Sequence, residues 1–265
     1  MKTLLVGLVL VSTSSFAHET SYSSDSCNVD INGGVSISKS DIEFLKHDKS
    51  LYKIVNNSTL VIKGEEVPLT SNQQILVTQF STDIRALIPQ AKNVATDALS
   101  LASEGVSLVF NELLGENNAV VEDLSTHFNE INYEIEKSFS ADQTIYFDED
   151  GFSRNEFFGD DFEERIESAV EQTIQNSIGS LMVAVGQELL FSGGNMDAFE
   201  AKMENFEEQM EYEMELRGKD IEKRANALCD ALIAIDRIEE NMRNEISEVA
   251  KFDILTASAK NQNRT

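Results

Sequence analysis

The chain has few of the residues and patterns on which recognisable enzyme chemistry depends. It contains two cysteines and three histidines in 265 residues. The cysteines, Cys27 and Cys229, are too far apart for a Cys-x-x-Cys redox pair. The sequence has neither a Gly-x-Ser-x-Gly nucleophile elbow nor a Gly-x-x-x-x-Gly-Lys phosphate loop. It therefore names no catalytic residue, implies no cofactor, and leaves the enzyme question open with non-enzymatic functions favoured.

Metal-binding patterns are also incomplete. A ferritin-like site needs Glu-x-x-His on facing helices, and no histidine here has a glutamate three residues before it. Asp148-x-Asp150-Gly151 resembles part of an EF-hand loop. With Gly151 at the sixth position, however, the first and twelfth positions hold Tyr146 and Phe157, which cannot coordinate calcium as that loop requires. This segment is expected to be a plain acidic turn, and no metal site is predicted.

Basic residues are scarce relative to acidic ones. The chain has 21 Lys and Arg against 47 Asp and Glu, which gives a net charge of −26. Such a surface repels nucleic-acid phosphates and anionic lipid, so neither is an expected partner. It favours solubility and basic or partly unfolded protein partners. Beyond the first 17 residues no segment is apolar for long enough to span a bilayer.

Residues 1–17 have the pattern of a secretory signal peptide. Lys2 precedes an apolar run over 4–11, and Ser15-Phe16-Ala17 approximates a small-x-small cleavage site. The apolar run is too short for a membrane span. The alternative is a buried N-terminal strand. The pattern predicts an exported protein whose mature chain begins at residue 18.

Export bears on the two cysteines, because disulfides persist in oxidising compartments. A Cys27–Cys229 bridge would close a loop of about 200 residues and stabilise the fold by about 5 kcal/mol on chain-entropy reasoning. Two buried thiols and a bridge between two chains are the alternatives. We expect the internal disulfide.

Alternating and helical periodicities predict an α+β fold. Residues 18–140 are expected to form a small antiparallel β-meander packed by helices, since such a thin sheet cannot stand alone. Asn32-Gly33-Gly34 is a candidate hairpin turn between the first two strands. The predicted strands cover 27–31, 35–38, 51–55, 59–62 and 67–69.

Helical period begins at residue 70. Ser71-x-x-Gln74 resembles a capping box, Pro89 should kink or restart the helix, and Gly115 should end it. A second amphipathic helix is predicted over 120–139.

The rest of the chain is predicted to be a connector, a long helical hairpin and a tail. The connector covers 141–159, with a strand at 144–147. Residues 160–255 should form an antiparallel, coiled-coil-like hairpin that turns at Gly193-Gly194. Residues 256–265 are polar and are predicted to be disordered.

One stripe in the second arm of the predicted hairpin is rich in methionine and phenylalanine. Methionine adapts to irregular partners and is frequent on promiscuous binding surfaces. The stripe is therefore a candidate surface for unfolded clients or a partner helix, and the alternative is ordinary hairpin or dimer core. Its members are Met196, Phe199, Met203, Phe206, Met210 and Met214.

Several short segments together resemble the YggN family of bacterial envelope proteins, a family of unknown function. They are Cys27-Asn-Val-Asp-Ile31, Thr59-Leu-Val-Ile-Lys-Gly64 before Val67-Pro-Leu-Thr70, the helix from Gln73-Gln74 through Ile88-Pro89-x-Ala91 to Leu101-Ala102, and Ala227-Leu-Cys-Asp-Ala-Leu232. The resemblance implies a Gram-negative periplasmic address and supports the cysteine pairing. It implies no activity and no site residues.

Three functions remain open on these grounds. The first is a non-enzymatic periplasmic protein that binds unfolded or envelope proteins in a chaperone-like way. The second is an enzyme acting on an envelope polymer through two carboxylates, which a deep pocket with a buried carboxylate of raised pKa would favour. The third is a structural homo-oligomer formed through the C-terminal helices.

Overall fold

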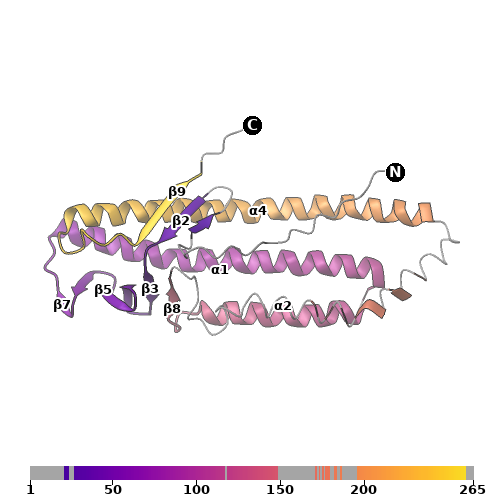
Figure 1. Ribbon diagram of the computed structural model, residues 1–265, viewed down its shortest axis with the longest axis horizontal. Coiled ribbons are helices and arrows are strands. Elements are labelled where there is room, and N and C mark those ends of the chain that lie inside the picture. Colours follow the sequence, from indigo (N-terminus) through magenta and orange to yellow (C-terminus); the bar gives the residue numbers. More distant parts are fainter. Residues whose placement is uncertain are drawn as a thin grey trace.

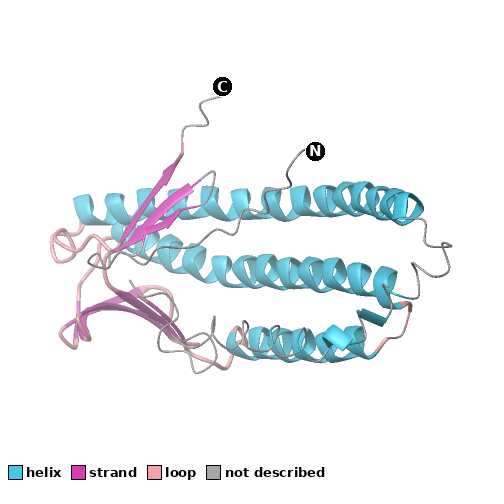
Figure 2. Cartoon of the chain, turned by 45° about the vertical axis from the view of Figure 1, so that its right-hand side comes forward, coloured by secondary structure: helices cyan, strands magenta, loops and turns pink. Residues whose placement is uncertain are grey.

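The computed structural model describes residues 21–23, 27–116, 118–148, separate positions within 171–186, and 196–260. The predicted signal peptide and the Gly193-Gly194 turn lie outside these residues. The fold is α+β, as predicted: an N-terminal antiparallel β region is followed by helices, including a long C-terminal one (Figure 1). Both sheets lie at the same end of the helices (Figure 2).

Two long helices run side by side in opposite directions. They are α1 (Ser71–Leu114) and α4 (Met196–Glu245). The side chain of Gln73 donates a hydrogen bond to the Glu245 carbonyl at 2.6 Å, so the start of α1 meets the end of α4. Further along, Asp97 pairs with Arg224. In the described residues the antiparallel partner of α4 is thus α1, whereas the sequence analysis expects the segment 160–192.

The ends of α1 follow its local sequence. Thr70 is the N-cap, and its side chain and that of Gln73 form the capping box, one residue earlier than predicted. Gly115 ends the helix with φ of 86°, a conformation that costs glycine least. Pro89 lies inside α1, which continues on both sides of it. The second predicted helix is α2 (Ala119–Ser138), which packs along α1.

The larger sheet has six antiparallel strands in the order β7-β6-β5-β4-β3-β8. Their bounds are β3 Gly34–Ile37, β4 Asp41–Lys46, β5 Lys49–Val55, β6 Thr59–Ile62, β7 Glu65–Glu66 and β8 Ile145–Phe147. The sequence analysis missed β4, although Ile42 and Phe44 alternate with polar neighbours. The predicted strand at 67–69 is absent, because the last strand of this hairpin is β7.

The smaller sheet joins the two ends of the chain. It has the order β1-β2-β9, with β1 at Ser21–Ser23, β2 at Cys27–Ile31 and β9 at Leu255–Ala259. The predicted disordered tail is therefore wrong for residues 256–259. The predicted hairpin between 27–31 and 35–38 is also wrong, since β2 pairs with β9 and β3 pairs with β4.

A single core connects these parts. Buried apolar side chains extend from Val29 in β2 through Phe44 and Phe80 to Met242 and Ala257. The predicted segments 18–140 and 160–255 consequently contribute to one core. In the described part of the chain, no helix has both the length and the apolar character needed to cross a membrane.

Candidate binding cavity

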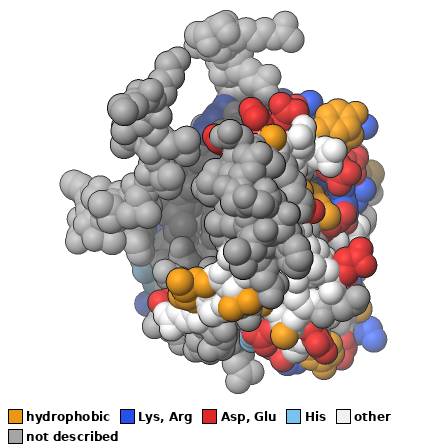
Figure 3. Space-filling model, turned by 90° about the vertical axis from the view of Figure 1, so that its right-hand side faces the viewer, with side chains coloured by type: hydrophobic (Ala, Val, Ile, Leu, Met, Phe, Trp, Pro, Cys, Tyr) orange, Lys and Arg blue, Asp and Glu red, His pale blue; other side chains and the backbone are white. Residues whose placement is uncertain are grey.

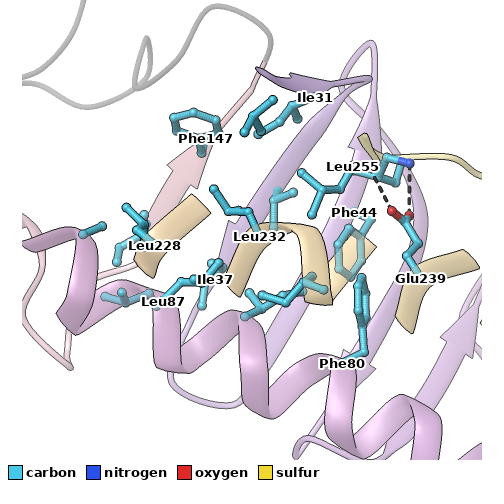
Figure 4. Close-up of a pocket in the computed structure, with 18 of the residues that line it drawn as sticks. Ile31, Ile37, Phe44, Phe80, Leu87, Phe147, Leu228, Leu232, Glu239 and Leu255 are labelled. Carbon is cyan, nitrogen blue, oxygen red and sulfur yellow. Dashed lines mark hydrogen bonds between the residues drawn. The ribbon is translucent and has the colours of Figure 1, made fainter. Parts of the chain in front are cut away.

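A cavity of about 270 Å³ lies where α1, α4 and both sheets meet (Figure 4). All but one of its lining residues are apolar, and the exception is Glu239. Its volume is almost twice that of a 150 Å³ apolar cavity that stays dry and binds benzene. It is slightly smaller than the 300–1,000 Å³ of ordinary small-molecule sites. The cavity can therefore accept an apolar group larger than a benzene ring.

Helical spacing directs two rows of side chains into this space. Residues three, four and seven positions apart share one face of a helix. On α1 this face presents Phe80, Ile84, Leu87, Ile88 and Ala91, and on α4 it presents Leu228, Leu232, Ile235 and Glu239. These residues were predicted to form core stripes. The sequence could not show that the two stripes enclose a space.

Two cross-strand rows of the larger sheet form another wall. One row pairs Phe44 of β4 with Val35 of β3, and Val35 with Phe147 of β8. In the other row, Ile37 of β3 pairs with Ile145 of β8. Since alternate residues of a strand face the same side of a sheet, these side chains lie together on the face toward the helices. The wall runs from β4 to the edge strand β8.

Exposure changes steadily along the cavity. We call Phe44, Phe80, Ile235 and Glu239 the closed end, because each side chain is at most 2% exposed. We call Ala91, Phe147 and Leu228 the open end, because all three are half-buried. The gradient has the same direction on α1, on α4 and across the sheet. The cavity thus closes beneath β4 and opens beside β8.

Glu239 seals part of the closed end. Its two carboxylate oxygens accept hydrogen bonds from the backbone N–H groups of Ile254 (3.0 Å) and Leu255 (2.8 Å), as Figure 4 shows. One turn earlier on α4, Asp236 accepts from the N–H of Ala257 at 3.1 Å. These bonds hold the C-terminal strap, residues 246–257, against α4. Because β9 pairs with β2 along its other edge, α4 carboxylates take the place of a further strand.

Burial raises the pKa of Glu239 to about 7, and the negative charge of Asp253 raises it further. The two strap N–H groups and Arg243 act in the opposite direction, since they stabilise the charged form. Tyr52 of β5 is also fully buried, and its pKa is raised well above the ordinary value by burial and by the charge of Glu239. Arg243 pairs with Asp253 at 2.7 Å.

The disulfide fastens two walls of the cavity together. Cys27 of β2 and Cys229 of α4 are bonded, with their Cα atoms 6.0 Å apart. Each has a cavity-lining neighbour: Val29 follows on β2, and Leu228 directly precedes Cys229 on α4. Of the pairings considered from sequence, the internal bridge is the one present.

The Met/Phe stripe, residues 196–214, lies away from this cavity. Met210 and Met214 are half-buried in a groove between α4 and α1, where the Met214 sulfur lies near Gly105. Met203 and Phe206 are half-buried as well. The side chains of Met196 and Phe199 lie outside the described residues. Partner binding by this stripe stays a prediction.

The acidic turn at Asp148 was the only other candidate cation contact, and most of it lies outside the described residues. Among the residues that are described, no group of three or more His, Cys, Asp or Glu side chains could hold a metal ion. The end of the molecule in Figure 3 shows Asp and Glu side chains scattered among apolar and basic ones.

Comparisons with known proteins give a family without an activity. A family model described as "Protein of unknown function (DUF2884)" matches residues 27–255. No curated protein and no solved structure matches the chain. The match covers every strand and helix that surrounds the cavity, from β2 to the start of β9.

Proposed function

We propose a binding function for this chain, which belongs to the DUF2884 family of proteins of unknown function. In this proposal it is an exported, non-enzymatic protein of the bacterial periplasm whose cavity holds an apolar ligand. The narrower assignment to the YggN family and the cleavable signal peptide at residues 1–17 belong to the same proposal.

The observation that carries the proposal is the cavity itself. It is enclosed by well-packed elements, yet about 270 Å³ within it is unfilled. Protein interiors seldom leave such a volume empty, because atoms lining a void lose their packing contacts. Apart from Glu239, whose oxygens already accept two hydrogen bonds, the walls offer only hydrocarbon. A ligand group that fits here must itself be apolar.

The disulfide supports the proposed address. The bridge between Cys27 and Cys229 is consistent with an oxidising compartment such as the periplasm. A chaperone-like role would use the same chemistry, with an apolar side chain of an unfolded envelope protein as the ligand.

One observation favours the alternative enzymatic function, because Glu239 is a buried carboxylate of raised pKa at a cavity wall. Catalysis by two carboxylates would need a second one free to act. The neighbouring acid, Asp236, accepts a hydrogen bond from the strap, as Glu239 does. Both acids are explained as anchors for the strap, and a binding function fits the apolar walls better.

Fluorescence of diphenylhexatriene tests the proposal, since this uncharged rod emits strongly only in apolar surroundings. Wild-type protein should increase its emission with saturation at one site per chain. Ala91→Phe adds a phenyl ring at the open end and should weaken binding at least tenfold.

Ala86→Phe is the matched control, because Ala86 is exposed on the same helix and does not line the cavity. It should bind diphenylhexatriene like wild type. No emission with wild type, or equal losses in the two variants while both remain folded by circular dichroism, would refute binding in the cavity.

A further inference from the structure

We infer that the cavity takes a single hydrocarbon chain of about ten to twelve carbons, tail first, leaving an uncharged polar head outside beside β8. This inference rests on the proposed function and names the class of ligand: a single-chain amphiphile rather than a two-chain lipid or a compact ring system.

The length of the cavity follows from the helix positions. Phe80 and Ala91 mark the two ends on α1, and Glu239 and Leu228 mark them on α4. Each pair is eleven residues apart, which corresponds to about 16 Å along a helix axis. A zigzag of carbon–carbon bonds of about 1.5 Å advances roughly 1.3 Å per carbon, so about twelve carbons span this length.

The two helices define the same direction independently. Contacts from Gln73 to Glu245 and from Asp97 to Arg224 fix their antiparallel alignment. In that alignment the closed-end residue Phe80 lies opposite Glu239, and the open-end residue Ala91 lies opposite Leu228. The cavity is therefore elongated along the helices.

The volume restricts the width. A space of about 270 Å³ that extends over most of 16 Å is narrow, and it is below the range of ordinary drug-sized sites. One extended chain fits these dimensions. Two parallel chains would need much more volume over the same length.

The distribution of polar groups sets the orientation. At the closed end, the one polar side chain that lines the cavity is Glu239, and both its oxygens already accept strap N–H groups. A polar head placed there would lose its hydrogen bonds to water and gain none. At the open end, Lys92 follows Ala91 and forms an ion pair with Glu136 of α2, so water and charged groups are close.

The net charge of −26 bears on the head group. An anionic head would be repelled by this surface, whereas an uncharged head would not. Alkyl glucosides therefore provide a suitable probe, because their chain length can be varied while the head stays constant and uncharged.

The test is displacement of diphenylhexatriene from the full chain, with its disulfide intact, by alkyl glucosides of six to fourteen carbons below their micelle concentrations. Affinity should rise about fourfold per added methylene while the chain is being buried. The rise should stop near ten to twelve carbons, where the tail reaches the closed end.

Two phenylalanine truncations locate that limit. Phe80→Ala removes a ring from the closed end and should move the limit to longer chains by about two or three carbons. Phe139→Ala removes a half-buried ring that lines the cavity after α2 and should leave the limit unchanged. If Phe80→Ala does not fold, Phe80→Leu should give a smaller shift in the same direction.

The outcomes separate the two proposals. If diphenylhexatriene and every glucoside fail to bind wild type, the binding function itself is refuted. If they bind but affinity rises without a limit up to fourteen carbons, or if the limit is the same in both truncations, only the tail-first insertion is refuted. A peptide segment or a second copy of the chain would then be the better candidate for occupant.

Discussion

Replacing Glu239 by glutamine should remove a pH dependence from the stability of the protein. Folding raises the pKa of this carboxyl from its ordinary 4.5 to about 7, so the folded state binds the proton more tightly than the unfolded state. The resulting stabilisation is fully present below pH 4.5 and is lost as the pH rises through 7. A shift of this size corresponds to about 3 kcal/mol.

The measurement is urea unfolding of wild type and Glu239→Gln at intervals from pH 4.5 to 8. Between the lowest and highest pH, wild type should lose about 3 kcal/mol relative to the variant. The variant also loses a strap hydrogen bond, because its NH₂ group faces a backbone N–H, but this cost does not depend on pH. Only the change in the difference between the two proteins is diagnostic.

Glu240→Gln controls for the loss of one negative charge, because Glu240 is the exposed neighbour of Glu239 on α4. The reasoning would be refuted if wild type and Glu239→Gln kept a constant difference over this range. It would also be refuted if wild type gained stability over the variant as the pH rose.

Two further substitutions test the packing around the cavity. Replacing Cys27 and Cys229 together by serine should lower the free energy of unfolding by about 3–5 kcal/mol, since the bridge closes a very long loop; unchanged urea midpoints would count against this. Phe44→Ala should cost about 3–5 kcal/mol, because Phe44 is buried and stacks on Tyr52 and Phe80. Leu216→Ala, at a side chain that is 52% exposed, should cost less than about 0.5 kcal/mol in the same titration, and equal costs would contradict the assigned core.

The helices of the N-terminal half and most strands could be predicted because their signals are local. The capping box at Thr70 and the glycine at 115 mark the ends of α1, and the period of its apolar residues gives its buried face. The strand at β8 was predicted from a short run of apolar residues. The disulfide could be predicted because the chain has only two cysteines.

The strap and its anchors could not be predicted, because their partners are distant in sequence. β9 is a short, largely polar segment whose partner, β2, lies at the other end of the chain. Glu239 is one of 47 acids, and its position on α4 looks like any solvated helix face until the strap covers it. The cavity depends on the relative placement of four walls, which periodicity does not specify.

The most direct test of the account is a crystal structure with a decyl glucoside that carries bromine on the last carbon of its chain. Anomalous scattering should place one bromine at the closed end, between Phe44, Phe80 and Ile235, with the sugar beside β8. A bromine beside β8 would contradict tail-first insertion. Bromine bound only on the outer surface would contradict the binding function.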